Sequence, residues 1–317
     1  MKTKIGILLP TREIILKDKP PGDAHEILEI SRYAENQNLD SLWVGDSILA
    51  KPRLDPLITL AAVATITENI RLGTSIYIPS LRDPVILAHT IMSINLIAGG
   101  RLMLGVGAGG TFNQSQIDEW EILNIDPTTR GSRLDEILNI LRLFSTQERI
   151  EFKGQHFEIK ANSLFHNINA AQTYPILCVC HGRNNIQNQF IRAAKHQGLI
   201  SISDYPNELQ YAIRRLEDYS RELSMPNQKY QAVFYMTINI NDNKSIAVNE
   251  ADSFINKYYG INIWQDRWGP FGEASKIIDR ANEYVEAGAT TLIFRFASFN
   301  QMEQIERFCN QIQNKIK

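Results

Sequence analysis

The chain has 317 residues, of which 44% are hydrophobic and 21% are charged, and its formal net charge is −2. A chain of this length buries well over half of its unfolded surface, and its mixed charges argue against disorder. The near-neutral charge gives no electrostatic footprint for nucleic acid, and no apolar run reaches the roughly 18 residues of a transmembrane helix.

Eight short apolar runs alternate along the chain with longer amphipathic stretches. Most runs are apolar at successive positions, which is typical of parallel strands that helices cover on both faces. The predicted strands cover residues 5–9, 41–44, 70–78, 102–106, 175–180, 199–202, 232–240 and 291–296. The predicted helices cover residues 24–36, 56–66, 85–97, 131–144, 185–196, 207–223, 245–258, 275–287 and 301–316.

Strands that alternate with helices predict parallel βαβ units, which close either as an open doubly wound sheet or as a barrel. The count of eight strands and the chain length favour a single (β/α)8 TIM barrel over residues 1–317. Two excursions, near residues 146–173 and 259–274, are predicted insertions at the C-terminal face. The first contains a hairpin around Lys153-Gly154-Gln155. The second carries Trp264, Trp268 and Phe271 and is predicted to be a lid that closes over a substrate or a wall of the pocket.

Chemistry in such a barrel gathers where the strands end. The string Gly105-Val-Gly-Ala-Gly-Gly110 follows the fourth predicted strand and matches GxGxxG. It makes a weak dinucleotide fingerprint, because three βα units precede it and no acid stands about 20 residues further on. The glycines indicate close approach of a ligand to the backbone, and the competing interpretation is a tight turn.

Three polar residues at strand ends are candidate catalytic residues: Asp46, His181 and Arg295. The competing interpretations are a cap or salt bridge for Asp46 and a solvated loop position for His181. Arg295 either meets an anionic ligand or pairs with Asp46 or another acid. Arg183 is a candidate phosphate partner.

No metal site is expected, because no Cys or His pair stands at zinc spacing near Cys178 and Cys180. Those two cysteines and Cys309 make a small, odd number, which favours a reducing cytoplasm over a disulfide scaffold. The amino-terminal segment also lacks the features of a signal peptide, so a cytoplasmic location is expected.

A series of short strings, in order over nearly the whole chain, resembles the bacterial luciferase-like monooxygenase family of flavin-dependent oxidoreductases. They are DSLWVGD (40–46), PRLDP (52–56), LAA (60–62), IRLGTS (70–75), RDP (82–84), GGRLMLGVG (99–107), RGSRLDE (130–136), FKGQHF (152–157) and YVEAGA (284–289). The resemblance implies a (β/α)8 barrel with an insertion, a flavin or deazaflavin across the barrel top, and a homodimer.

The resemblance also implies roles for residues at four strand ends. Asp46 would approach the isoalloxazine ring, and a cis peptide bond between Ser75 and Ile76 would buttress it. Contacts to the ring, its tail and its phosphate are implied for Gly107, Ala108, Gly109, Asn113, Cys180, His181, Gly182 and Arg183. The chain departs from many relatives at Ser47, where they have His, and at His89, where they have Lys or Arg. It also has Gly110 and Thr111 where deazaflavin-dependent sugar-phosphate dehydrogenases carry Glu.

The function expected from the resemblance is a monooxygenase that uses reduced FMN and oxygen on a small organic substrate. A separate flavin reductase would supply the FMN, because the chain has no nicotinamide fingerprint. One alternative is hydride transfer with the deazaflavin coenzyme F420. The other is a non-catalytic flavin-binding subunit of a heterodimer.

Overall fold

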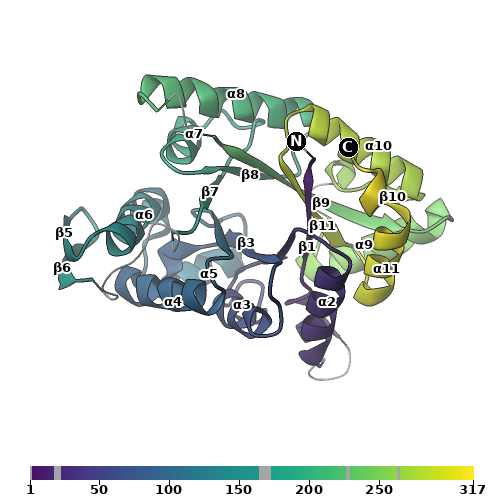
Figure 1. Cartoon of the computed structure of the whole chain (residues 1–317), viewed down its shortest axis with the longest axis horizontal. Helices are drawn as coiled ribbons and strands as arrows, with labels where there is room; N and C mark the ends of the chain where they lie inside the picture. Colours follow the sequence, from purple (N-terminus) through teal and green to yellow (C-terminus); the bar gives the residue numbers. More distant parts are fainter. Residues whose placement is uncertain (1, 18–22, 164–172, 226–228, 263–264) are drawn as a thin grey trace.

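A computed structural model of the chain describes residues 2–17, 23–163, 173–225, 229–262 and 265–317. Eight parallel strands form a closed barrel in the order β1, β2, β3, β4, β7, β8, β9, β11. Each strand pairs with its neighbours in this order, and β11 pairs with β1. The ring closes between β11 and β1, so segments from opposite ends of the chain lie side by side (Figure 1). The predicted TIM barrel is confirmed. Its strands are β1 Lys4–Leu8, β2 Ser41–Val44, β3 Arg71–Tyr77, β4 Leu102–Val106, β7 Ile176–Val179, β8 Gly198–Ile202, β9 Gln231–Ile240 and β11 Thr291–Phe296.

Helices surround the barrel, and each of the nine predicted helices is present. Asp55 and Asp83 cap α3 and α4. Each stands directly before the proline that begins the helix and accepts the backbone N–H bonds of the two residues after that proline. The helices that follow the prediction are α2 His25–Asn36, α3 Pro56–Ala64, α4 Pro84–Ile97, α6 Arg130–Thr146, α7 Gln187–Ala194, α8 Pro206–Glu222, α9 Lys244–Tyr259, α10 Ala274–Glu286 and α11 Gln301–Gln311. The structure adds α1 Glu13–Leu16, α5 Gln114–Ile122 and the 3-10 turns Pro79–Leu81, Pro127–Thr129, Gln265–Arg267 and Gln313–Lys315.

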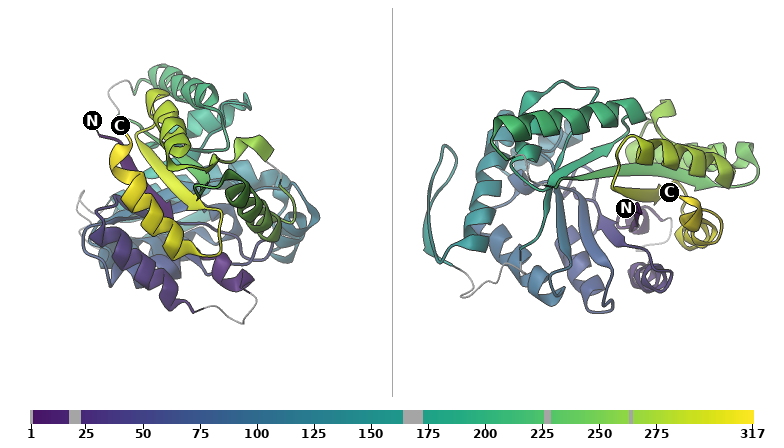
Figure 2. Two further views of the ribbon diagram at one scale, coloured as in Figure 1. Left: turned by 90° about the vertical axis from the view of Figure 1, so that its right-hand side faces the viewer. Right: turned by 45° about the horizontal axis from the view of Figure 1, so that its top comes forward.

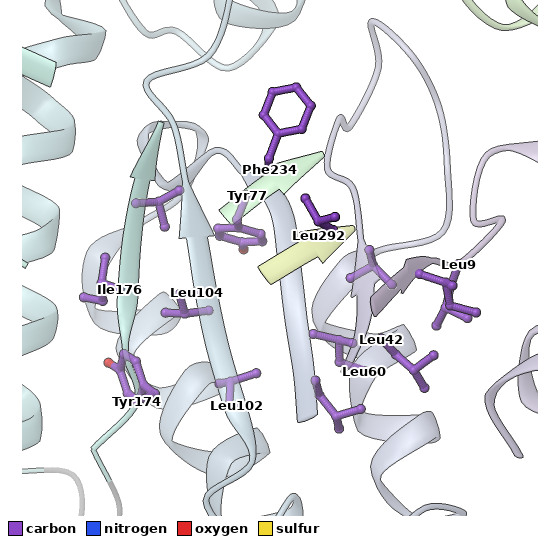
Figure 3. Packing of buried hydrophobic residues seen from close by; sticks show 14 of the residues in the cluster. Leu9, Leu42, Leu60, Tyr77, Leu102, Leu104, Tyr174, Ile176, Phe234 and Leu292 are labelled. Carbon is purple, nitrogen blue, oxygen red and sulfur yellow. The ribbon is translucent and has the colours of Figure 1, made fainter. Parts of the chain in front are cut away.

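The core has one apolar layer outside the strands and one inside. The outer layer packs the strands against the helices, and Figure 3 shows Leu42, Leu104 and Leu292 within it. The inner layer fills the barrel around the fully buried indole of Trp43. Gly73 lies under that indole, and a Cβ there would come within 2.3 Å of the ring. Side chains therefore fill the inside of the barrel, and a ligand can bind only at its ends.

The first excursion forms the antiparallel hairpin of β5 Arg149–Lys153 and β6 Glu158–Asn162, outside the ring of helices (Figure 2). The Glu136 carboxylate on α6 holds it by accepting backbone N–H bonds from Gln155, His156 and Phe157 at 2.6, 3.0 and 3.1 Å. Residues 164–172 of this excursion lie outside the described residues. The hairpin is therefore fixed to α6.

The second excursion adds the short strand β10 Phe271–Gly272 to the edge of β9. Trp268 is 6% exposed and packs with Phe254 and Tyr258 of α9. Trp264 lies outside the described residues. The described part of this loop therefore packs against α9. Its role as a lid or a pocket wall stays a prediction. No helix within the described ranges is long and apolar enough to span a membrane.

Candidate active site

The carboxyl ends of the barrel strands meet at one mouth, which has two chemically different halves. One half is built on β3, β4, β7 and β8, and we call it the apolar half: Ile76, Gly107, Val179 and Ile202. The other is built on β11 and on the loops after β1 and β2, and we call it the cationic half: Arg12, Lys51, Arg53 and Arg295.

The apolar half is partly exposed to solvent. Ile76, Val179 and Ile202 pack on the inner core cluster, yet each keeps some exposure to solvent. Gly107 lies between them, and a Cβ there would approach methyl groups of Ile76 and Val179 at 3.1 and 3.2 Å. The peptide bond between Ser75 and Ile76 is cis, as the resemblance implies. Ser75 Oγ beside it is buried and has no hydrogen-bond partner among the described residues. A partly exposed apolar surface at the barrel mouth suits a planar flavin or deazaflavin ring.

The loop after β7 is held in place by Asp204. Its carboxylate accepts from Gly182 N at 2.8 Å, Arg183 Nη1 at 2.9 Å and Ser201 Oγ at 2.9 Å, and it lies 3.4 Å from His181 Nδ1. Burial acts to raise the pKa of Asp204, but the contacts with His181, Gly182 and Ser201 hold it below its usual value. Asp204 therefore fixes the loop that carries the predicted phosphate contacts.

Cys180 lies under this loop and points away from solvent. It is fully buried, its thiol donates to the backbone oxygen of Gln189 at 3.2 Å, and burial raises its pKa well above the ordinary value. Its buried thiol offers no surface to a ligand, and its cofactor role stays a prediction. Gly109 has a φ of +82°, and Asn113 Oδ1 caps α5 by accepting from Gln116 N at 3.1 Å. The Asn113 side chain thus caps the helix that follows the glycine loop, and its contact with the cofactor stays a prediction.

Asp46 forms a buried ion pair. Arg82 donates to its two oxygens at 2.5 and 2.8 Å, and the backbone N–H of Ile78 donates at 2.9 Å. Burial raises the pKa of Asp46, and Arg82 acts against that shift. The structure therefore gives Asp46 the salt bridge that the sequence left open, with Arg82 and not Arg295 as the partner. Asp46 also lines a cavity of about 160 Å³.

Arg295 is 1% exposed and enclosed by aromatic rings. Its Cζ lies 4.4 Å from the ring centre of Trp268 and 5.1 Å from that of Tyr258. Its Nη1 donates to Tyr259 Oη at 2.5 Å. Glu13, itself 2% exposed, is the acid that acts on it electrostatically.

Several residues of the mouth were not predicted as site residues. Glu119 on α5 accepts bonds at one oxygen from the backbone N–H groups of Ile48, Leu49 and Ala50, at 2.7, 2.7 and 3.2 Å, and from Ser47 Oγ at 3.2 Å. It fixes the loop after β2. Arg53 lies in the PRLDP string and Lys51 directly precedes it. The string was identified from the sequence, but these two cations were not predicted as site residues.

A family model described as luciferase-like monooxygenase matches residues 3–299. The chain belongs to this family. Luciferase-like proteins of this family are oxidoreductases, so the expectation of an enzyme holds at that level. The family assignment agrees with the series of strings in the sequence.

Individual comparisons with luciferase-like relatives are more distant. An F420-dependent glucose-6-phosphate dehydrogenase of Amycolatopsis mediterranei is 23% identical over 92% of this chain and 94% of its own length. A solved F420-dependent secondary alcohol dehydrogenase, in complex with an F420-acetone adduct, has a TM-score of 0.79 at 18% identity, over 100% of both chains. The monooxygenase RslO1 of Streptomyces bottropensis has a TM-score of 0.80 at 17% identity, over 98% of this chain and 99% of its own. These solved structures support the fold alone.

Proposed function

We propose that this chain is an oxidoreductase that transfers hydride between a deazaflavin coenzyme and a small organic substrate. The observation that carries the proposal is the partly exposed apolar half of the mouth, taken with a relative named as F420-dependent that matches over 94% of its own length. This gives the deazaflavin alternative precedence over the FMN monooxygenase that the sequence first favoured. The FMN reading is the second candidate, because a monooxygenase matches the fold equally well.

In this proposal the bound coenzyme supplies the hydride chemistry at its ring, and the protein positions the reactants. Ile76, Val179 and Ile202 bind one ring face and exclude water from it. Gly107 allows close approach because it lacks a Cβ. His181 follows β7 and is the candidate general acid–base, with Asp204 3.4 Å from its Nδ1.

The proposal is tested by titrating the purified protein with the deazaflavin coenzyme and with FMN, each oxidised and reduced. We expect the deazaflavin to bind with a micromolar dissociation constant and FMN at least about tenfold more weakly. Tight binding of reduced FMN with oxygen consumption would instead establish the monooxygenase, which would need the separate reductase. Binding of neither coenzyme would favour the non-catalytic subunit.

A matched pair of variants tests the placement of the ring. Gly107→Ala puts a methyl group in the apolar half, and we expect it to weaken coenzyme binding about tenfold or more. Gly131→Ala is the control, because a Cβ at Gly131 meets nothing within 4 Å. Equal affinities of the two variants would refute this placement.

A further inference from the structure

The cationic half gathers four positive side chains around two tyrosine rings. The ring centre of Tyr258 lies 5.2, 5.8 and 5.1 Å from the guanidinium carbons of Arg12, Arg53 and Arg295. Lys51 Nζ lies 4.5 Å from the ring centre of Tyr259, and the Arg295 guanidinium carbon lies 5.2 Å from it. These cations come from three separate segments of the chain, and the barrel mouth brings them together.

The acids near the mouth do not balance these four charges. Asp46 is paired with Arg82, and one oxygen of Glu119 is bonded to four donors of the loop after β2. Glu119 keeps its charge because these donors are neutral, and Glu13 is a buried carboxyl whose pKa burial raises, so two carboxyls of the described residues face the four cations. The excess positive charge lowers the pKa of Lys51. Burial first, and then Arg53, Arg12 and Arg295, lower its pKa to about 8.

Arg295 presents an unused edge for hydrogen bonding. Nη1 is occupied by Tyr259, whereas Nε and Nη2 are buried and have no hydrogen-bond partner in the described part of the chain. These two groups lie on the same edge of the guanidinium plane, which is the fork that binds two oxygens of a carboxylate or a phosphate. Thr237 on β9 is in register with Arg295, and its Oγ1 is also buried, with no hydrogen-bond partner among the residues that the structure describes.

A cavity adjoins this cluster. It has a volume of about 160 Å³, and its lining includes Lys51, Arg53 and Tyr259 together with Ser47 and Gly110. Ser47 and Gly110 follow β2 and β4, and Asp46 and Glu119 also line the cavity, so it lies at the mouth beside Lys51 and Arg53. A substrate anion held here would lie at the same mouth as a ring bound to the apolar half.

We propose that the cationic half binds an oxyanion, carboxylate or phosphate, of the substrate, with Arg295 as the bidentate partner and Lys51 and Arg53 as further cations. The role of the bound anion as substrate rests on the proposed function, because it needs the coenzyme nearby. The anion site itself does not depend on the coenzyme. It names the substrate class as a small organic acid or phosphate ester.

The anion site is tested on the full chain without coenzyme. Inorganic phosphate, acetate and chloride are titrated at constant ionic strength, with tryptophan fluorescence as the readout, because Trp268 stacks on Arg295. We expect saturable binding of phosphate or acetate at millimolar concentration and none of chloride. Competition between phosphate and acetate identifies the preferred oxyanion. Absence of saturable binding would overturn the proposal.

Variants separate the site from nonspecific charge. We expect Lys51→Met and Arg295→Met each to weaken anion binding about tenfold or more. Lys51→Met keeps the test valid if the buried Arg295 variant does not fold. Lys153→Met removes an exposed cation of the hairpin and should change nothing. Anion affinity equal in Lys51→Met and wild type would refute the proposal.

Coenzyme titration keeps this proposal distinct from the proposed function. Anion binding without deazaflavin binding would leave the subsite standing and remove the coenzyme assignment. Deazaflavin binding with no anion binding would do the reverse. If Lys51→Met weakens the deazaflavin and the anions equally, the cluster holds the coenzyme tail, and the substrate assignment is wrong.

Discussion

Replacing Asp46 with asparagine separates a structural role from a catalytic one. The Asp46 side chain is 1% exposed and that of Arg82 is 17% exposed, so the pair lies almost entirely out of water. Removing one partner of such a pair costs ~3–5 kcal/mol, because the other charge stays buried without compensation. Asparagine keeps an acceptor for Ile78 N, so we expect Asp46→Asn to lower the free energy of unfolding by ~3 kcal/mol.

A double-mutant cycle in urea measures the pair itself. We expect Arg82→Met to cost ~3 kcal/mol as well, and the double variant to cost no more than either single change, which gives a coupling energy of ~2–3 kcal/mol. Glu151→Gln, which breaks an exposed pair with Arg149, should cost less than ~0.5 kcal/mol. Deazaflavin affinity and turnover are measured on the same variants. An Asp46→Asn protein of normal stability that has lost turnover would refute the structural assignment and make Asp46 catalytic.

Two further predictions concern the loop after β2. Glu119→Ala removes one acceptor from four donors, and because the loop is partly solvated we expect a loss of ~2–4 kcal/mol in urea, with faster amide exchange at residues 48–50. Glu121→Ala on the exposed face of the same helix is the control, and equal losses would contradict the clamp. Lys51 also sets a pH dependence, because its ammonium faces Arg12, Arg53, Arg295, Tyr259 and Glu119. It is charged below a pKa of about 8, so anion affinity should be full at pH 7 and fall as the pH rises through that value. A pH profile of the phosphate dissociation constant that is flat from pH 7 to 9, or unchanged in Lys51→Met, would contradict this.

The barrel could be predicted from sequence because its strands are buried on both faces. Burial on both faces leaves unbroken apolar runs such as residues 102–106, and these runs mark each strand to within a few residues. The helix Gln114–Ile122 was not predicted, because its sequence has no apolar stripe and few of its residues are buried. The helix Glu13–Leu16 was too short for any periodicity to appear.

The place of the site could be predicted, but its pairings could not. Strand ends locate the mouth in any parallel barrel, so Asp46, His181 and Arg295 were identified by position. Their partners depend on barrel closure. Asp46 meets an arginine 36 positions away, and Arg12 lies against the ring of Tyr258, which follows it by more than two hundred positions. Spacing along the chain carries no information about such contacts.

The order of strands around the barrel also decides when the protein can be completed during synthesis. β11 lies between β9 and β1, so the ring stays open until residues 291–296 have left the ribosome. Until then β1 and β9 expose unpaired backbone edges, through which incomplete sheets aggregate. Arg295 arrives on that same strand, after the aromatic side chains that enclose it. Ring closure and the supply of this cation are therefore one late event of biosynthesis, and a product truncated before β11 lacks both.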